Sequence, residues 1–146
     1  MTATVVVLGA GYAGVAAVDR LESVRPDDTE IVWVSESADH LVLHEVHRCI
    51  RDPAVAESIT IPVERIIGSE TTFREARVEA VQSNERRVIC ADGPSIEYDY
   101  AVVALGSTTA TYDIPGVLEH GHTLKSLDDA RGIHDAVRSA VEDGDP

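Results

Sequence analysis

The run VVVLGAGYAGVAAV at residues 5–18 places three glycines within six positions: Gly9, Gly11 and Gly14. The apolar stretch Thr4–Leu8 before them is continuous rather than alternating, which predicts a strand buried on both faces of a parallel sheet. Apolar residues then recur at helical spacing until Pro26, so we expect a helix over residues 12–24. Residues 31–34 predict a second strand, which completes a βαβ unit. The predicted fold class is therefore α/β, with a doubly wound parallel sheet.

The glycine spacing suits a strand-to-helix turn that receives a pyrophosphate group. In such a turn Gly9 permits the tight bend, Gly11 lets the pyrophosphate approach the backbone, and Gly14 lets the helix pack close to the strand. The N–H groups at the helix start, including those of Tyr12 and Ala13, favour each negative charge by about 0.3–1 kcal/mol. The run has no charged side chain, although the chain has 26 acidic residues. We therefore predict a dinucleotide site; a purely structural turn is the alternative.

A carboxylate after the second strand completes this pattern. The position that usually holds the ribose-binding carboxylate falls at Ser35 or Glu36. We favour Glu36, because it is the first carboxylate after the strand and lies about 20 residues beyond the turn. Its charge would bind a ribose 2′-hydroxyl and repel a 2′-phosphate. The βαβ unit alone leaves FAD and NAD undecided.

A second motif separates the two cofactors. The segment YDYAVVALGS, residues 98–107, is similar to the YDxLVxATGS strand of flavoproteins with two dinucleotide-binding domains, and Ile114–Gly116 follows it as in those proteins. With LKSLDDA at residues 124–130, nearly the whole chain resembles the N-terminal part of type II NADH dehydrogenases. These enzymes belong to the pyridine nucleotide-disulfide oxidoreductase superfamily and pass hydride from NADH through FAD to a quinone. The sequence departs from the motif at Leu105, where the family has threonine.

The resemblance implies a Rossmann-like FAD-binding domain and further cofactor contacts. It places backbone contacts to FAD at Ala104, Leu105 and Gly106, puts Val78 near the adenine, and runs residues 40–47 past the flavin. FAD, NADH and a quinone are the implied partners, and no catalytic residue is assigned. Residues 1–146 would form a single, incomplete FAD-binding domain, without the NAD-binding domain and the C-terminal segment, and inactive by itself. The alternatives are a truncated, non-catalytic dinucleotide-binding module or a fragment of another FAD-dependent oxidoreductase, such as sulfide:quinone oxidoreductase.

The remaining elements are predicted from local patterns. Three short runs with tight turns predict an antiparallel meander over Phe73–Val81, Arg87–Ala91 and Ile96–Tyr98. Tyr100–Leu105 predicts another buried strand. A helix could cover Leu41–Arg51, and a final helix is expected from Ser126 to near Gly144, with Asp129 in capping-box spacing. Cys49 and Cys90 lack the spacing of a redox pair and are expected to be small buried side chains.

Three histidines near the middle of the chain, His40, His44 and His47, raise the question of a metal site. The last two could share a helical face beside Glu45. No second cluster completes a ligand set, so we assign no metal. Surface or flavin-proximal histidines are the simpler interpretation.

The charge balance of the chain restricts the classes of partner that it can bind. The chain has 12 basic and 26 acidic residues, a net charge of -14, and Lys125 is its only lysine. This balance argues against nucleic acid or an anionic membrane surface as a direct partner. It resembles the acidic, lysine-poor proteins of extreme halophiles, in which molar salt screens self-repulsion. We find no signal peptide or transmembrane segment, and expect a cytoplasmic protein. The full-length enzyme could lie peripheral to the inner face of the membrane.

Overall fold

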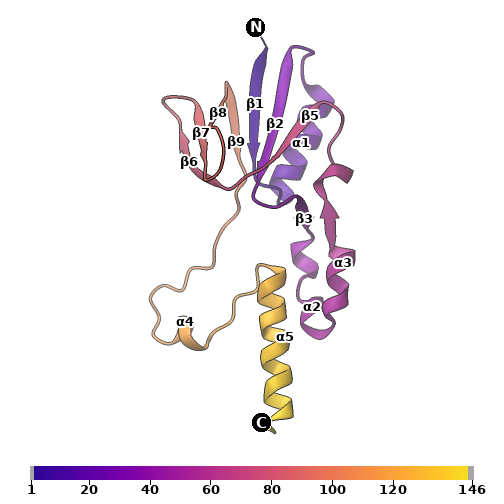
Figure 1. Ribbon diagram of the computed structural model, residues 1–146, viewed down its shortest axis with the longest axis vertical. Helices are drawn as coiled ribbons and strands as arrows, with labels where there is room; N and C mark the ends of the chain where they lie inside the picture. The colour runs from indigo at the N-terminus through magenta and orange to yellow at the C-terminus, as the bar shows by residue number, and fades with distance from the viewer. Residues whose placement is uncertain (1, 145–146) are drawn as a thin grey trace. The chain divides into compact units, whose positions relative to one another are not determined.

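The structure, a computed structural model, describes residues 2–144 and divides them into two compact units (Figure 1). The first unit takes its residues from 1–40 and 62–106, and the second from 41–61 and 107–146. Each unit is described by itself below. That residues 1–146 form one incomplete FAD-binding domain stays a prediction.

The first unit is built on a four-stranded parallel sheet with the strand order β5-β2-β1-β9. Its strands are β1 (Ala3–Leu8), β2 (Thr29–Ser35), β5 (Thr71–Glu75) and β9 (Tyr100–Val103). Helix α1 (Tyr12–Val24) connects β1 to β2, with the bounds that the sequence predicts. The α/β class with a doubly wound, Rossmann-like arrangement is thus confirmed.

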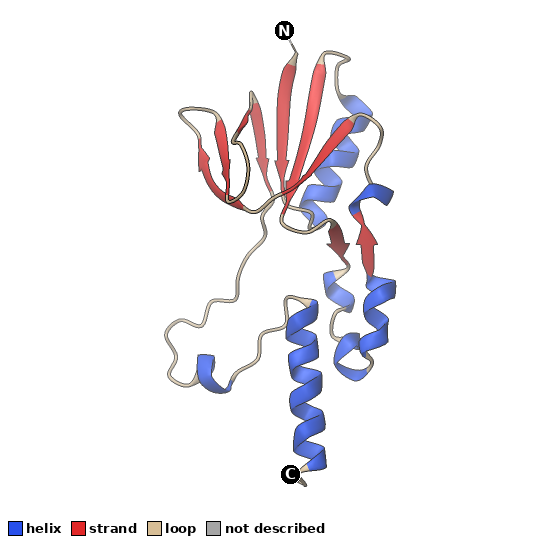
Figure 2. Cartoon of the chain, in the orientation of Figure 1, coloured by secondary structure: helices blue, strands red, loops and turns tan. Residues whose placement is uncertain are grey.

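Apolar side chains alternate between the two faces of β1. Val6 and Leu8 pack in a cluster with Val88 and Ile96 of the small antiparallel sheet. Val7 packs on the opposite face with Val18 of α1 and with Trp33. The sheet therefore lies between a helical layer and a second sheet (Figure 2), which explains why its central strand reads as a continuous apolar run.

The antiparallel meander is present, but its first strand was predicted too long. The run Phe73–Val81 divides into β5, which joins the parallel sheet, and β6 (Val78–Gln82), which pairs with β7 (Arg87–Cys90). Strand β8 (Ile96–Glu97) completes the meander.

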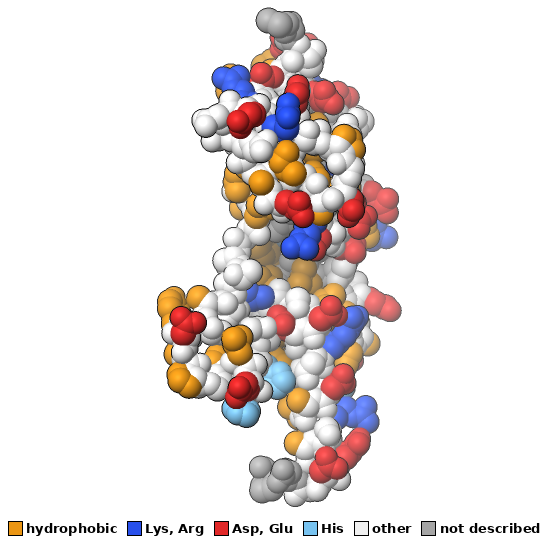
Figure 3. All heavy atoms as spheres, turned by 60° about the vertical axis from the view of Figure 1, so that its left-hand side comes forward, with side chains coloured by type: hydrophobic (Ala, Val, Ile, Leu, Met, Phe, Trp, Pro, Cys, Tyr) orange, Lys and Arg blue, Asp and Glu red, His pale blue; other side chains and the backbone are white. Residues whose placement is uncertain are grey.

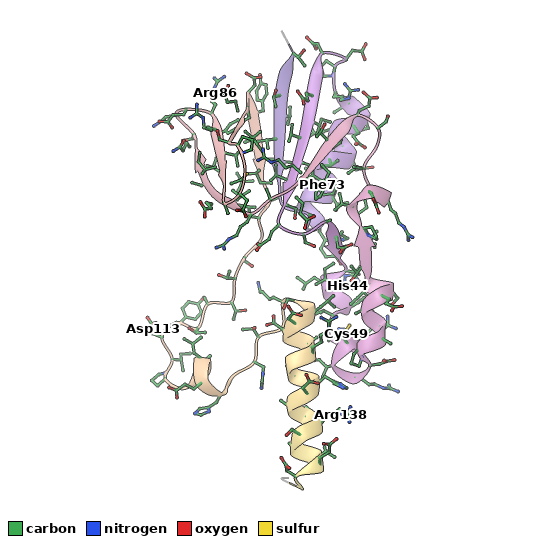
Figure 4. All side chains as sticks on the ribbon, in the orientation of Figure 1. His44, Cys49, Phe73, Arg86, Asp113 and Arg138 are labelled. Carbon is green, nitrogen blue, oxygen red and sulfur yellow. The ribbon has the colours of Figure 1, made fainter. Side chains whose placement is uncertain are left out.

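The break in this run occurs at Ala76. Its N–H donates to the carbonyl of Ser35 at 2.8 Å, at the end of the parallel ladder. Phe73 lies on β5 (Figure 4), where its ring meets Trp33 edge-on at 5.8 Å. No glycine or proline marks the crossing between the two sheets, so the apolar pattern alone could not reveal it.

The second unit is mainly helical, with α2 (Arg48–Arg51), α3 (Ala56–Ile59), α4 (Val117–His120) and α5 (Leu127–Glu142). The single helix expected over Leu41–Arg51 is wrong. Its start belongs to β3 (Asp39–Leu41), which forms a two-stranded sheet with β4 (Thr60–Pro62), and a 3₁₀ turn over Leu43–Glu45 precedes α2. Short 3₁₀ helices also cover Pro53–Val55 and Val63–Arg65, the latter in the first unit.

The core of the second unit joins α2 to α5. Cys49 on α2 (Figure 4) is buried in a cluster with Ile59 and Ala130. His134 of α5 adds a hydrogen bond from its ring Nδ1 to the carbonyl of Ile50, 2.8 Å away. Both cysteines are free and buried, as the sequence predicts.

The N-terminus of α5 carries the predicted capping box. The N–H of Asp129 donates to the Ser126 hydroxyl, and the Asp129 carboxylate accepts the Ser126 N–H, both at 3.0 Å. The Thr123 hydroxyl donates to the same carboxylate at 2.6 Å, and the Lys125 N–H donates at 2.7 Å. The Thr123 and Lys125 hydrogen bonds hold the pKa of Asp129 below its ordinary value.

We therefore expect Asp129 to stabilise the chain at neutral pH. Because folding lowers the pKa of Asp129, this stabilisation is complete above the ordinary carboxyl range, starts to decrease below about pH 4, and is lost as the pH falls through the lowered pKa. Asp129→Ala should lower the free energy of unfolding by about 1 kcal/mol at pH 7, the usual magnitude for a lost cap. Urea unfolding of both proteins at pH 7 and near pH 3 measures the difference in their free energies of unfolding, which should be smaller near pH 3. A difference that stays constant between the two pH values would contradict the stabilising role of the Asp129 carboxylate.

Acidic side chains are spread over the face drawn in Figure 3, and the Lys and Arg side chains lie among them rather than in one patch. None of the helices in the described part of the chain is long and apolar enough to cross a membrane.

Candidate functional site

The candidate site lies at one edge of the parallel sheet. Because β1, β2, β5 and β9 are parallel, their carboxyl ends meet there. The residues that follow these ends are tied together by three backbone hydrogen bonds: Gly9 N–H to Val34 O (2.7 Å), Ala104 N–H to Leu8 O (2.8 Å) and Ala76 N–H to Ser35 O (2.8 Å). The structure thus brings together the glycine turn and the ends of the two strands that flank β1.

The strand order places a switch point beside β1. From β1 the chain crosses through α1 to β2 on one side, whereas β9 pairs with the other side of β1. In open α/β sheets, ligands bind outside the carboxyl ends of the strands where the order reverses in this way. The glycine turn and residues 104–106 line this position.

Gly9 and Gly14 are required by the packing of the turn. Gly9 has φ +102°, and a Cβ at Gly9 would collide with the carbonyl oxygen of Ala104. A Cβ at Gly14 would collide with the carbonyl oxygen of Gly9. These two glycines let the turn approach β9 and let α1 approach the turn.

Gly11 is different, because nothing in the fold requires a glycine at this position. Its φ of -74° is open to any residue, and a Cβ built there meets no atom within 4 Å. The space over Gly11 is therefore open, and a side chain at this position would fill it. A pyrophosphate could approach the backbone through this space, which is the access that the second glycine of the motif provides.

The helix start supplies the matching electrostatics. Gly11 is the N-cap of α1, no side chain caps the helix, and its first turn has no acidic residue. Tyr12 and Ala13 are exposed in this turn. The N–H groups of a helix start and the positive end of the helix dipole favour an anion here.

Two side chains brace the turn from the protein side. The indole Nε1–H of Trp33 donates to the carbonyl of Gly9 at 2.9 Å. The ring Nδ1 of His40 hydrogen-bonds to the carbonyl of Ala10 at 2.7 Å. His40 also meets the ring of Tyr12 edge-on, with centroids 5.0 Å apart.

The two candidate ribose contacts, Ser35 and Glu36, differ in their exposure. Ser35, the last residue of β2, is buried, and its hydroxyl accepts the N–H of Ser37 at 3.4 Å. Glu36 directly follows the strand end and is exposed. A ribose could therefore meet the carboxylate of Glu36, whereas the Ser35 hydroxyl faces the local backbone.

The other predicted contacts lie at the same edge. Val78 begins β6 two residues after Ala76, which is bonded to the end of β2. Strand β9 ends at Val103, so Ala104 and Leu105 lie beyond the strand rather than inside it as predicted, and Gly106 follows them. Gly106 has φ +77°, and Leu105 is half exposed. Each of these cofactor contacts stays a prediction.

The three histidines are divided between the two units. His40 is 5% exposed and belongs to the first unit, so placing it on the surface is wrong. His44 and His47 belong to the second unit. Near them, a hydrogen bond from Arg48 lowers the pKa of Glu45. Across residues 2–144, no three side chains of the metal-binding kinds gather as a metal site would require.

The hydrogen bonds of Trp33 and His40 to the turn were not predicted from the sequence. Trp33 lies on the buried strand β2 with no exposed surface, and nothing in the sequence assigns its side chain to the turn. His40 was considered only as a surface, flavin-proximal or metal-binding residue. A tryptophan in a buried strand and a histidine some 30 positions after the turn carry no local signal that their ring N–H groups reach the backbone of the turn.

The parallel sheet, its helical layer and the glycine turn define a Rossmann-like α/β fold. Residues 3–141 match the family described as pyridine nucleotide-disulphide oxidoreductase, and the chain belongs to this family.

Relatives include an external alternative NAD(P)H-ubiquinone oxidoreductase B1 of Solanum tuberosum mitochondria, 32% identical over 94% of this chain. A type II NADH:quinone oxidoreductase of Staphylococcus haemolyticus is 29% identical over 88% of it. The chain spans only 26% and 32% of the length of these two relatives.

Solved structures share the fold. The sulfide:quinone oxidoreductase of Aquifex aeolicus superposes with a TM-score of 0.83 at 21% identity, covering 96% of this chain and 32% of that one. NDH2 from Plasmodium falciparum in complex with NADH gives 0.78 at 18% identity, covering 92% and 28%. At these identities the likeness concerns the fold alone.

Proposed function

We propose that this chain is the FAD-binding portion of an NADH:quinone oxidoreductase. The open space over Gly11 carries the proposal, because it lies beside the switch point of the sheet, at a helix start that no side chain caps. The fold gives no other reason for a glycine there. A binding site for the pyrophosphate of a dinucleotide gives one.

The residues at this edge would hold the cofactor in complementary ways. The N–H groups of Gly11, Tyr12 and Ala13 would bind the pyrophosphate, and the carboxylate of Glu36 would accept the ribose hydroxyl. The backbones of Val78 and of residues 104–106 would contact the remainder of the dinucleotide. When bound, FAD supplies a flavin that accepts hydride and passes electrons on. The chain's own contribution is to bind and orient the nucleotide part of the cofactor.

The named relatives support NADH and a quinone as the reaction partners, since both are described as quinone or ubiquinone oxidoreductases. The sulfide:quinone oxidoreductase likeness is limited to the fold. Cys49 and Cys90 are both buried, and they lie in different units. Buried thiols suit a structural role better than a sulfide-oxidising one, which favours the NADH assignment.

Calorimetric titration with FAD tests the binding part of this proposal. We expect saturable binding to one site per chain; a chain that binds no adenine dinucleotide would refute it. The reaction is tested on the full product of the gene, by NADH consumption with a soluble quinone. An FAD-loaded product that oxidises no NADH would instead identify a non-catalytic dinucleotide-binding module.

Glu36 predicts a nucleotide preference. Its carboxylate would bind a free ribose 2′-hydroxyl and repel a 2′-phosphate, so we expect the chain to bind FAD more tightly than NADP. Glu36→Gln should weaken FAD binding and reduce the difference in affinity between FAD and NADP, because the substitution removes the charge and keeps the shape of the side chain. Calorimetry with FAD, NAD and NADP measures both effects. Wild-type binding of NADP as tight as that of FAD would exclude the assigned role.

We further propose that the protein is cytoplasmic, with the full-length enzyme peripheral to the inner face of the membrane.

We also propose that the acidic surface is suited to molar salt, as in an extreme halophile. With 26 carboxylates against 12 basic residues, self-repulsion is strongest in dilute buffer. The melting temperature should therefore rise from dilute buffer to molar KCl. A melting temperature that is flat or falls over this range would remove the halophile interpretation.

A further inference from the structure

We propose that His40 and Trp33 are positioning residues that aim the N–H groups of the glycine turn at the pyrophosphate. This inference rests on the proposed function, because it concerns how the same edge binds a dinucleotide. The two side chains hydrogen-bond to two successive carbonyls, those of Gly9 and Ala10. Each bond fixes one peptide plane of the turn.

The direction of each N–H follows from peptide geometry. In a trans peptide the C=O and the N–H of the next residue point in opposite directions, and the structure contains no cis peptide among its described residues. Holding Gly9 O on Trp33 therefore turns the N–H of Ala10 away from the indole. Holding Ala10 O on His40 turns the N–H of Gly11 away from the imidazole in the same manner.

These N–H groups are left for a ligand. Within residues 2–144, no backbone carbonyl accepts the N–H of Ala10 or Gly11. The N–H of Gly9, by contrast, is used by the carbonyl of Val34. The carbonyls of Gly9 and Ala10 thus point toward Trp33 and His40, whereas the N–H groups of Ala10 and Gly11 point away from these side chains. A rotated Ala10 peptide would instead present a carbonyl oxygen to the phosphate, and the two would repel.

Both donors are rigidly held. Trp33 has no exposed surface and packs edge-on against Phe73, while His40 is 5% exposed and packs edge-on against Tyr12. Because a carbonyl only accepts, the Nδ1 of His40 must carry the proton of this hydrogen bond. The position of one nitrogen on the ring therefore decides whether Ala10 is held.

Two substitutions test this position directly. The amide nitrogen of Asn can replace the donor at Nδ1, whereas that of Gln extends further, toward the place of Nε2. We expect His40→Asn to bind FAD with nearly wild-type affinity and His40→Gln to bind about tenfold more weakly, because it leaves a buried carbonyl without its donor. Calorimetry is done at a temperature where each protein is fully folded.

A stability control separates positioning from folding. Asp129→Ala weakens a helix cap in the second unit, so it should lower the melting temperature without changing FAD affinity. Trp33→Phe removes the other donor while keeping an aromatic ring, and should also weaken FAD binding about tenfold. It serves as the second variant where His40 substitutions fail to fold.

The outcomes distinguish this inference from the function on which it rests. Wild-type binding of FAD together with unchanged affinity in His40→Gln and Trp33→Phe overturns the positioning role alone. Equal loss in His40→Asn and His40→Gln also overturns it, because the location of the donor would then be irrelevant. A wild-type chain that binds no FAD overturns the proposed function, and the positioning role with it.

Discussion

Gly11→Val should reduce FAD affinity by at least about a hundredfold while the protein stays folded. The valine side chain would enter the open space over Gly11, where the pyrophosphate is expected to approach the backbone. Losing both the contacts and the charge-assisted hydrogen bonds to the turn accounts for an effect of this order. Since φ at Gly11 is -74° and no atom lies near, the fold has no reason to change. Calorimetry gives the affinity, and circular dichroism and a thermal melt give the fold.

Gly132→Val is the matched control for this experiment. Gly132 also has no atom within 4 Å of a built Cβ, but it lies on α5 in the second unit. It should leave FAD affinity unchanged. Gly11→Val with wild-type affinity would show that the turn is only structural, the alternative that the sequence left open.

Gly14→Ala should have the opposite signature, a large loss of stability. A Cβ at Gly14 would overlap the carbonyl oxygen of Gly9, a backbone atom that is itself bonded to Trp33. Helix α1 would have to move away from the turn and from the core around Val18. Overpacking of this kind costs on the order of 3 kcal/mol. Urea unfolding of the variant and the wild type measures it.

Gly132→Ala provides the reference for the same chemical change. In an exposed helix interior with open space, Ala replaces Gly favourably, by about 0.5–1 kcal/mol. The two Gly-to-Ala variants should thus move the free energy of unfolding in opposite directions. A Gly14→Ala protein as stable as the wild type would show that α1 does not pack on the turn as described.

Much of the first unit could be predicted because its signals are local. The glycine spacing, the helix ending before Pro26 and the apolar run of β1 each determine their own element. The capping box at Ser126 likewise marks the start of α5 from four consecutive residues. For such elements, the residues that cause the structure also lie within it.

Long-range features were not predictable in the same way. Phe73 and Val78 belong to different sheets, and the crossing depends on a hydrogen bond between Ala76 and Ser35, far apart in sequence. The bracing of the turn by Trp33 and His40 is equally non-local. A single sequence records that these side chains can donate a hydrogen bond, and only the fold decides to which carbonyl.

The most direct test of the proposed site is an NMR titration of the isotope-labelled chain with FAD, followed through its backbone amide signals. We expect the largest changes at Gly11 and Ala13, with further changes at Glu36 and Gly106. Thr4 and Asp99 lie at the opposite edge of the sheet, where the Thr4 N–H donates to the Asp99 carboxylate and the Asp99 N–H donates to the Thr4 carbonyl. The amide signals of these two residues should stay unchanged. Saturable FAD binding that leaves the amide signals of Gly11 and Ala13 unchanged would contradict the proposed site at the glycine turn.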